Sequence, residues 1–283
     1  MEDREQKMRK LSEYLAGLGS VAVAFSGGVD STFLLQAAKD VLGDGVIALT
    51  AVSDFFPDRE RREADAFCRE RGIRQIICRE EILKVPGVAE NPANRCYLCK
   101  RALFEMFLAQ AKRQGFSHVA EGSNLDDLGD YRPGLQAIAE LGILSPLREC
   151  GFSKEDIRAL SKEMGLPTAS KPSYACLASR FAYGEEITGE KLAMVDQAEQ
   201  LLLDLGFTQM RVRIHGTLAR IEVLPEDFPR LAEPALRREI AEKLKTYGFS
   251  YVTADLAGYR TGSMNEILGA NGKEKVDMLV ASE

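Results

Sequence analysis

The sequence predicts an α/β fold with two domains, and three observations carry this prediction. Apolar runs alternate with helical patterns through the first half of the 283 residues. A loop with two adjacent glycines follows the first apolar run, and after residue 187 the order changes to helix, hairpin, helix and strand. We therefore expect a Rossmann-like domain over residues 1–165, a linker over 166–186 and a smaller C-terminal α+β domain over 187–283.

Short apolar runs predict the strands of the first domain, at residues 21–25, 46–52, 74–78, 118–121 and 143–146. Amphipathic spacing or capping signals predict its helices, at residues 31–42, 59–71, 99–114 and 154–164. Strands that alternate with helices form a parallel sheet with helices on both faces. Ligands of such a sheet bind at the carboxyl ends of the strands, so we expect the site there.

The second half of the chain has a different pattern. Residues 166–186 are rich in small side chains without a clear period, and such a long irregular segment is usually functional. Beyond it the pattern predicts a helix at residues 190–205 and then a hairpin whose strands are residues 210–214 and 218–223. A second helix at residues 234–247 and a strand at residues 251–256 are predicted to follow.

Composition restricts the class of protein. The net charge of −6 and the pI of about 5.3 argue against a nucleic-acid partner. The charged N-terminus does not resemble a signal peptide, and no apolar run reaches the length of about 18 residues that a membrane helix needs. We expect a cytoplasmic protein without a membrane partner. Its six cysteines are then better interpreted as thiols or metal ligands than as disulfides.

The loop after the first predicted strand is typical of a phosphate site. Adjacent Gly27 and Gly28 allow a backbone with φ above zero, whose N–H groups and following helix N-terminus attract an oxyanion. Asp30 beside an anion implies Mg²⁺. The alternative is a glycine-rich turn after a core strand. The residues expected to hold the phosphates are Phe25, Ser26, Gly27, Gly28, Val29, Asp30 and Ser31.

A second loop follows the predicted strand at 118–121. It supplies Gly122, Ser123, Asn124 and Asp127, and we expect these residues to form the other rim of a nucleotide site. The alternative is a helix cap. Arg132, a few residues later, is expected near a phosphate.

Three cysteines form a candidate metal site. Cys96 and Cys99 make a C-x-x-C pair at the start of a helix, which favours thiolates, and Cys176 lies in the irregular segment. Three cysteines suffice for a [4Fe–4S] cluster with one open iron. A zinc site would need a fourth ligand, for which His118 and His215 have no suggestive spacing. A redox disulfide and inert thiols remain open.

Two arginines alternate on one predicted strand. Arg211 and Arg213 should point to the same face, where two guanidinium groups are best explained by a shared phosphate or carboxylate. The alternative is a solvated edge strand. Glu199 on the preceding helix is expected to orient one of these arginines.

The motif SGGVDS resembles the PP-loop of the ATP pyrophosphatase superfamily, whose domain is adenine nucleotide alpha hydrolase-like. Together with NRCYLCK, EGSNLDD, DYRPG, SYACLASR, RVRIHGTLARIEV and DLAGYRTGSMNE, in this order, it resembles the LarE family of ATP-dependent sulfur transferases. The resemblance implies a role in nickel-pincer nucleotide synthesis. Family members adenylate the carboxylates of pyridinium-3,5-dicarboxylate mononucleotide, release pyrophosphate, and then replace AMP by sulfur.

The resemblance also implies residue roles. Family members either sacrifice the sulfur of one cysteine, here Cys176, or hold a [4Fe–4S] cluster with three, here Cys96, Cys99 and Cys176. The three cysteines favour the cluster type. Cys176, Asp30, Glu199, Arg211 and Arg213 are the expected catalytic residues, and the substrate is expected to bind to Ser179, Arg180, Arg211 and Arg213.

The implied partners are a sulfur donor, either a small sulfide source or a desulfurase, and further copies of the chain in a homo-oligomer. Three other functions compete with this interpretation: a PP-loop tRNA thiolase, an ammonia-dependent amidating ligase and a non-catalytic nucleotide-binding regulator.

Overall fold

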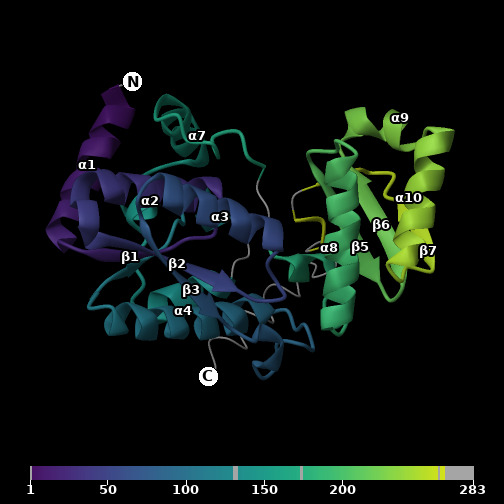
Figure 1. The fold of residues 1–283 in the computed structure, drawn as a ribbon, viewed down its shortest axis with the longest axis horizontal. Coiled ribbons are helices and arrows are strands. Elements are labelled where there is room, and N and C mark those ends of the chain that lie inside the picture. The colour runs from purple at the N-terminus through teal and green to yellow at the C-terminus, as the bar shows by residue number, and fades with distance from the viewer. Residues whose placement is uncertain (1, 130–132, 173–174, 261, 265–283) are drawn as a thin grey trace. The chain divides into compact units, whose positions relative to one another are not determined.

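The computed structural model describes residues 2–129, 133–172, 175–260 and 262–264, and contacts divide the chain into two units. The N-terminal unit contains Met1–Glu81 and Cys96–Tyr174, and the C-terminal unit contains Ile82–Arg95 and Ala175–Glu283. Figure 1 labels most helices and strands of both.

Residues 82–95 belong to the C-terminal unit and not to the first domain. This segment was expected in the first domain, but it pairs with the chain that follows Cys176. The backbone N–H of Gly184 donates to Asn91 O at 2.8 Å, and that of Ile187 donates to Ala89 O at 2.8 Å. Such pairs join residues about a hundred positions apart, so no local pattern in the sequence could predict them.

The N-terminal unit contains a four-stranded parallel sheet of order β3-β2-β1-β4. Its strands are β1 Val21–Ala24, β2 Val46–Val52, β3 Arg74–Arg79 and β4 Val119–Ala120. The fifth strand expected at 143–146 is absent from the described residues. Leu144 forms only a single bridge to Ala120, and Pro146 begins a helix, because proline lacks the N–H that a strand needs.

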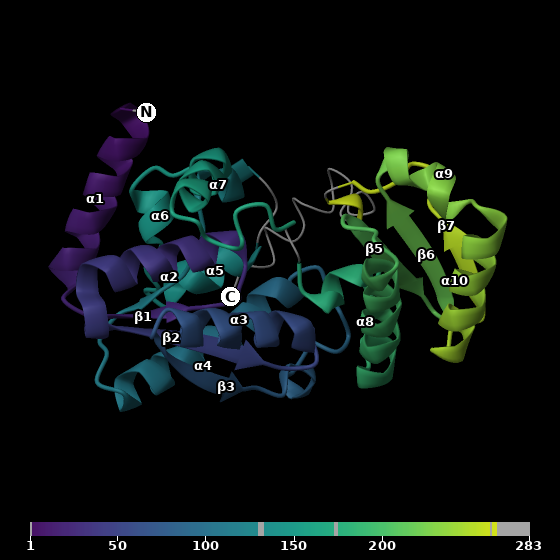
Figure 2. The same ribbon diagram turned by 45° about the horizontal axis from the view of Figure 1, so that its top comes forward.

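Helices cover both faces of this sheet, as Figures 1 and 2 show. They are α1 Glu2–Leu18, α2 Val29–Leu42, α3 Asp58–Glu70, α4 Arg95–Arg113, α5 Pro133–Glu140, α6 Pro146–Glu149 and α7 Lys154–Glu163. One core joins α1, α2, α3 and α7 to the face that carries Val21 and Val23. The other joins α4 and α5 to the face that carries Ala22. The predicted parallel sheet with helices on both faces is confirmed.

The sequence analysis did not predict α1. Charged residues are frequent in its first half, but Leu11 and Leu15 lie four positions apart and are buried in the first core. Met8, Tyr14 and Leu18 pack against the same core, so the apolar positions 8, 11, 15 and 18 follow a helical spacing from which this helix could have been predicted.

The C-terminal unit contains a three-stranded sheet of order β5-β6-β7. Its elements are α8 Gly189–Asp204, β5 Met210–His215, β6 Leu218–Val223, α9 Phe228–Leu231, α10 Pro234–Thr246 and β7 Tyr251–Ala254. Strands β5 and β6 pair antiparallel, as the predicted hairpin requires, and β7 adds in parallel to β6. Short 3₁₀ helices occur at Gly43–Gly45, Ile82–Lys84, Leu125–Gly129, Leu177–Arg180 and Pro225–Asp227.

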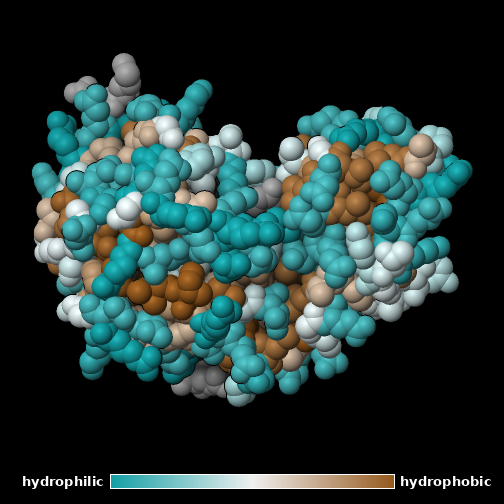
Figure 3. All heavy atoms as spheres, viewed as in Figure 1, coloured by the Kyte–Doolittle hydropathy of each residue, from teal (hydrophilic) through white to brown (hydrophobic). Residues whose placement is uncertain are grey.

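On the face shown in Figure 3, hydrophilic residues cover most of the surface and apolar residues form separate patches. Among the described residues, no helix has both the length and the apolar character that crossing a membrane would require.

Candidate active site

The loop between β1 and α2 has the geometry of an anion site. Gly27 has a φ of +73°, a backbone conformation that favours glycine, and a Cβ at this position would lie in contact with Glu60 O of α3, at 3.4 Å. Gly28 is the N-cap of α2, which places Asp30 and Ser31 in the first helical turn. The Oγ atoms of Ser26 and Ser31 lie 3.1 Å apart and order the loop. The side chains of Phe25 and Val29 are buried in the core, so only their backbone groups could meet a ligand of this loop.

Gly122 brings the loop after β4 against this first turn. A Cβ on Gly122 would lie 3.0 Å from Ser31 N and 3.2 Å from Asp30 Cβ, so a larger residue would push the two loops apart. Beside it, Asn124 Nδ2 donates to Asp30 Oδ1 at 3.3 Å. The structure therefore brings together two loops that were predicted at the carboxyl ends of strands, because these strands, β1 and β4, are neighbours in the sheet.

The other residues of the second loop fix its own shape. Asp127 Oδ2 accepts a hydrogen bond from Asn124 N at 2.9 Å. Ser123 donates through N and Oγ to buried Glu121 Oε2, at 3.0 and 2.8 Å, and Ser145 Oγ donates to Glu121 Oε1 at 2.6 Å. Ser123 and Asp127 thus support the loop through bonds within it, as a cap would. Arg132 lies outside the described residues.

Two lysines at this site were not singled out from the sequence. Lys154 Nζ, on the first residue of α7, forms an ion pair with Asp30 Oδ2. Lys171 Nζ donates to Gly27 O at 3.0 Å and to Glu63 Oε2 at 2.5 Å. A signal for Lys154 does exist, because a cation in the first turn of a helix opposes the helix dipole and therefore needs a separate explanation.

The cysteines of the C-x-x-C pair lie in the first turn of α4, which begins at Arg95. Cys96 and Cys99 are three positions apart and therefore share a face of the helix; Cys96 is half-buried and Cys99 is buried. Cys176 belongs to the C-terminal unit. Among the described residues, no group of three or more His, Cys, Asp or Glu side chains is arranged to hold a metal ion. The cluster therefore stays a prediction.

Arg180 is buried beside Cys176 in the C-terminal unit. Its Nε and Nη2 donate to the two carboxylate oxygens of Glu199, each at 2.8 Å, and both side chains are only 1% exposed. Its Nη1 donates to Ala175 O at 2.6 Å, to Cys176 O at 3.0 Å and to Ser179 Oγ at 2.9 Å. The guanidinium group thus connects α8 to the main chain that carries Cys176.

Glu199 was expected to orient Arg211 or Arg213, and the arginine that it contacts with both carboxylate oxygens is Arg180. It also accepts a hydrogen bond from Val212 N of β5 at 3.1 Å. Burial raises the pKa of Glu199, but the charge and hydrogen bonds of Arg180, with a smaller contribution from Arg211, outweigh burial and hold that pKa below its usual value.

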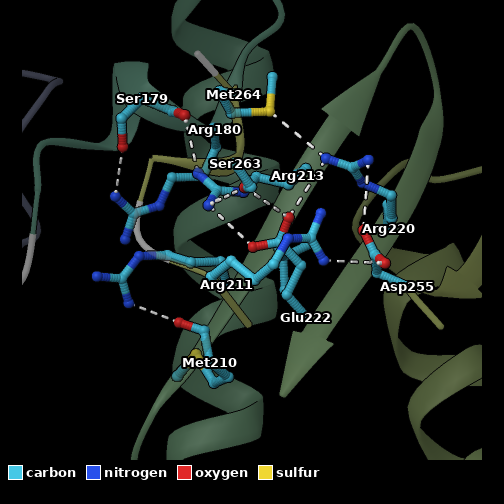
Figure 4. A network of polar contacts seen from close by, with 12 residues as sticks. Ser179, Arg180, Met210, Arg211, Arg213, Arg220, Glu222, Asp255, Ser263 and Met264 are labelled. Carbon is cyan, nitrogen blue, oxygen red and sulfur yellow. Dashed lines mark hydrogen bonds and ion pairs between the residues drawn. The ribbon is translucent and has the colours of Figure 1, made fainter. Parts of the chain in front are cut away.

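Arg213 belongs to a second buried network, drawn in Figure 4. Its Nη2 donates to Glu222 Oε2 at 2.8 Å and to Ser263 Oγ at 3.0 Å, and its Nη1 donates to Ser179 O at 3.0 Å. Arg220 lies directly across the sheet from Arg213 and also contacts Glu222, at 3.3 Å. Glu222, together with Asp255, which lies 3.4 Å from Arg220, offsets the repulsion between the two opposed arginines.

Arg211 is buried on the same strand. Its Nη1 donates to Met210 O at 2.6 Å, and its guanidinium carbon lies 5.3 Å from the centre of the Tyr259 ring. Burial lowers the pKa of Arg211, and the charges of Arg180 and Arg213 lower it further. The alternative of a solvated edge strand is wrong for β5, because Arg211 and Arg213 are only 3% and 5% exposed.

Comparisons with known proteins give long matches. No protein-family model matches the chain. Over 264 residues the chain is 42% identical to the uncharacterized protein slr1717 of Synechocystis sp., with 93% of the chain and 98% of that protein covered. It is 39% identical over 264 residues to pyridinium-3,5-bisthiocarboxylic acid mononucleotide synthase of Lactiplantibacillus plantarum, with 93% and 95% covered. The glutamine-hydrolyzing GMP synthase of Aliarcobacter butzleri is 25% identical over 210 residues, 67% of this chain and 40% of that protein.

Proposed function

Because the chain belongs to the family of pyridinium-3,5-bisthiocarboxylic acid mononucleotide synthases, which are ATP-dependent sulfurtransferases, we propose that it thiolates both carboxylates of pyridinium-3,5-dicarboxylate mononucleotide. The observation that carries the proposal is the strand–loop–helix site from Phe25 to Ser31, against which the loop of Gly122 packs. Backbone N–H groups at a helix N-terminus suit the phosphates of ATP.

The reaction begins with adenylation. A carboxylate oxygen of the substrate attacks the α-phosphorus of ATP, the bond to the bridging oxygen breaks, and pyrophosphate leaves. A sulfur nucleophile then attacks the acyl carbon, the bond to the adenylate oxygen breaks, and AMP leaves. The N–H groups of the loop and the hydroxyl groups of Ser26 and Ser31 would stabilise the charge that develops on the pyrophosphate.

Asp30 is the residue that would hold Mg²⁺. Its side chain is 24% exposed and carries oxygen donors, which fits Mg²⁺, since this ion is commonly bound by one or two carboxylates together with substrate phosphates. Bound there, the ion would neutralise charge on the leaving pyrophosphate.

The sulfur is proposed to come from a [4Fe–4S] cluster held by Cys96, Cys99 and Cys176. Two thiols on one turn of α4 suit cysteine ligation. The cluster would supply a transferable sulfide on its open iron. Through its bonds to the carbonyl groups of Ala175 and Cys176, Arg180 would orient the third ligand.

Ser179, Arg180, Arg211 and Arg213 are proposed to bind the anionic groups of the substrate. Arg211 favours this role, because burial and then the charges of Arg180 and Arg213 lower its pKa, and an anion bound beside it would offset both. The sulfur donor, whether a small sulfide source or a desulfurase, and the homo-oligomer remain predictions.

The adenylation step is tested by pyrophosphate release from ATP in the presence of the substrate. Asp30→Ala should slow release at least about a hundredfold, because the proposed magnesium ligand is lost. The matched control is Asp44→Ala, which removes an exposed carboxylate beyond the other end of α2. Release at near wild-type rate by Asp30→Ala would refute the ATP assignment.

The sulfur source is tested by iron and acid-labile sulfide content after purification without oxygen. We expect about four iron atoms and at least about as many sulfides per chain, and their loss in Cys99→Ala. Cys150→Ala, which removes a buried thiol outside the proposed ligands, should keep its iron. Absence of iron after reconstitution, with a loss of the mass of H₂S from Cys176 after turnover, would show the sacrificial mechanism instead.

A further inference from the structure

The ion pair between Lys154 and Asp30 joins two elements of the N-terminal unit that are distant in sequence. Lys154 is the first residue of α7, and Asp30 lies in the first turn of α2. Both side chains are part-buried, with 30% and 24% of their surface exposed. The ammonium group of Lys154 is therefore at the loop that is proposed to bind the phosphates of ATP.

Hydrogen bonds of the main chain fix the start of α7, which carries Lys154. Its N–H donates to Asp126 Oδ2 at 2.7 Å, and Leu125 N donates to Phe152 O at 2.9 Å, so the loop after β4 holds the start of α7. Ser153 and Asp156 close a capping box around the same turn. A cation in the first turn of a helix opposes the helix dipole, so the dipole of α7 does not stabilise the charge of Lys154.

Asp30 faces two competing cations in the proposed reaction. If its carboxylate binds Mg²⁺, the ammonium group of Lys154 loses its partner at the moment when phosphate oxygens arrive at the loop. Lysine is a compact charge on a flexible stem with three donors, so it can turn from one acceptor to another without movement of the main chain.

We propose that Lys154 exchanges Asp30 for a phosphate oxygen of the bound nucleotide. Without nucleotide it neutralises Asp30; with nucleotide and Mg²⁺, Asp30 binds the metal and Lys154 binds the phosphate. The inference rests on the proposed ATP site and adds to it a residue that touches the leaving group. Lys171 differs, because its ammonium group is held by the carbonyl oxygen of Gly27 and the carboxylate of Glu63, which support the loop itself.

The test is calorimetric binding of ATP in EDTA, where no metal bridges Asp30 and the nucleotide. In Asp30→Asn the lysine is released, so this variant should bind metal-free ATP more tightly than the wild type. Adding Lys154→Met to Asp30→Asn should weaken binding about tenfold or more, the effect of losing a charged hydrogen bond. Adding Lys154→Arg should retain most of the affinity, because the charge remains.

The matched control adds Lys39→Met to Asp30→Asn. Lys39 lies in the last turn of α2, away from the phosphate loop, and pairs with exposed Asp44. This variant loses the same charge from the same unit, so its affinity for metal-free ATP should equal that of Asp30→Asn. Equal affinities of Asp30→Asn with and without Lys154→Met, in proteins with unchanged melting temperatures, would overturn the exchange. Failure of the wild type to bind ATP with Mg²⁺ would instead refute the proposed ATP site, on which the exchange rests.

Discussion

The phosphate loop of the N-terminal unit and the arginine network of the C-terminal unit are two candidate anion sites built in opposite ways. The loop uses backbone N–H groups and hydroxyls from consecutive residues, and Ser26 in it is exposed. The network uses side chains from several elements, buried and already in contact with carboxylates such as Glu199 and Glu222. The first kind of site is encoded locally, whereas the second depends on pairs that only the folded chain brings together.

The largest effect should come from removing a carboxylate of the buried network. Glu199→Ala leaves Arg180 buried beside an empty position, and breaking a buried pair in this way costs about 3–5 kcal/mol of unfolding free energy. Urea unfolding measures this loss. Gln197→Ala, an exposed change on the same helix, should leave stability almost unchanged. A loss of less than about 1 kcal/mol in Glu199→Ala would mean that the pair behaves as surface ion pairs do.

A smaller effect is expected on substrate affinity. Arg213→Ala should weaken binding of the pyridinium mononucleotide about tenfold to a hundredfold, the effect of a lost charged hydrogen bond, and leave ATP binding unchanged. Arg220→Ala is the comparison, since Arg220 contacts the same Glu222 from the neighbouring strand. If both variants keep their substrate affinity, the network is structural and the contrast between two anion sites fails.

The smallest effect concerns the helix that presents Lys154. Burial raises the pKa of Asp156, but hydrogen bonds from Lys7, Arg4 and Ser153 outweigh burial and hold that pKa well below its usual value. The stability this carboxylate contributes is therefore present above the unfolded pKa of about 3.9 and is lost as the pH falls through the folded pKa. Asp156→Asn should cost about 1–2 kcal/mol at neutral pH.

The same variant has a pH signature. The difference in unfolding free energy between wild type and Asp156→Asn should narrow as the pH falls below about 4, because Asp156 of the unfolded wild-type chain takes up a proton there while the folded carboxylate stays ionised. Urea unfolding at a series of pH values measures it. A difference that stays constant down to the acid limit would show that the charge of Asp156 contributes nothing to the stability of this turn.

Local sequence predicted most of the N-terminal unit and the loop at its site, since strand runs, two glycines and a helix start are features of neighbouring residues. It could not predict that Gly122 allows close packing against Asp30, nor that Lys154 reaches Asp30 from 124 positions away. The strand predicted at residues 143–146 is a further example. This apolar run ends in Pro146, and in the structure Leu144 forms a single bridge and Pro146 begins α6.

In the C-terminal unit, residue types were more predictable than partners. The alternation of Arg211 and Arg213 on one strand was predictable, but their burial was not, because it depends on packing of α8 against β5. Glu199 was recognised as a partner for an arginine, and the arginine it contacts with both oxygens is Arg180. Charge pairing of this kind depends on side-chain positions that no periodic pattern encodes.

Arg180 fixes the main chain at Cys176 without involving the thiol of that residue. The guanidinium group bonds the carbonyl oxygens of Ala175 and Cys176, and neither bond involves the thiol. Alkylation of the thiol or the variant Cys176→Ala therefore removes neither acceptor of these bonds. The backbone of this segment is thus held independently of what the thiol binds, so a site that has given up its transferable sulfide and one that carries it would present the same backbone to the substrate.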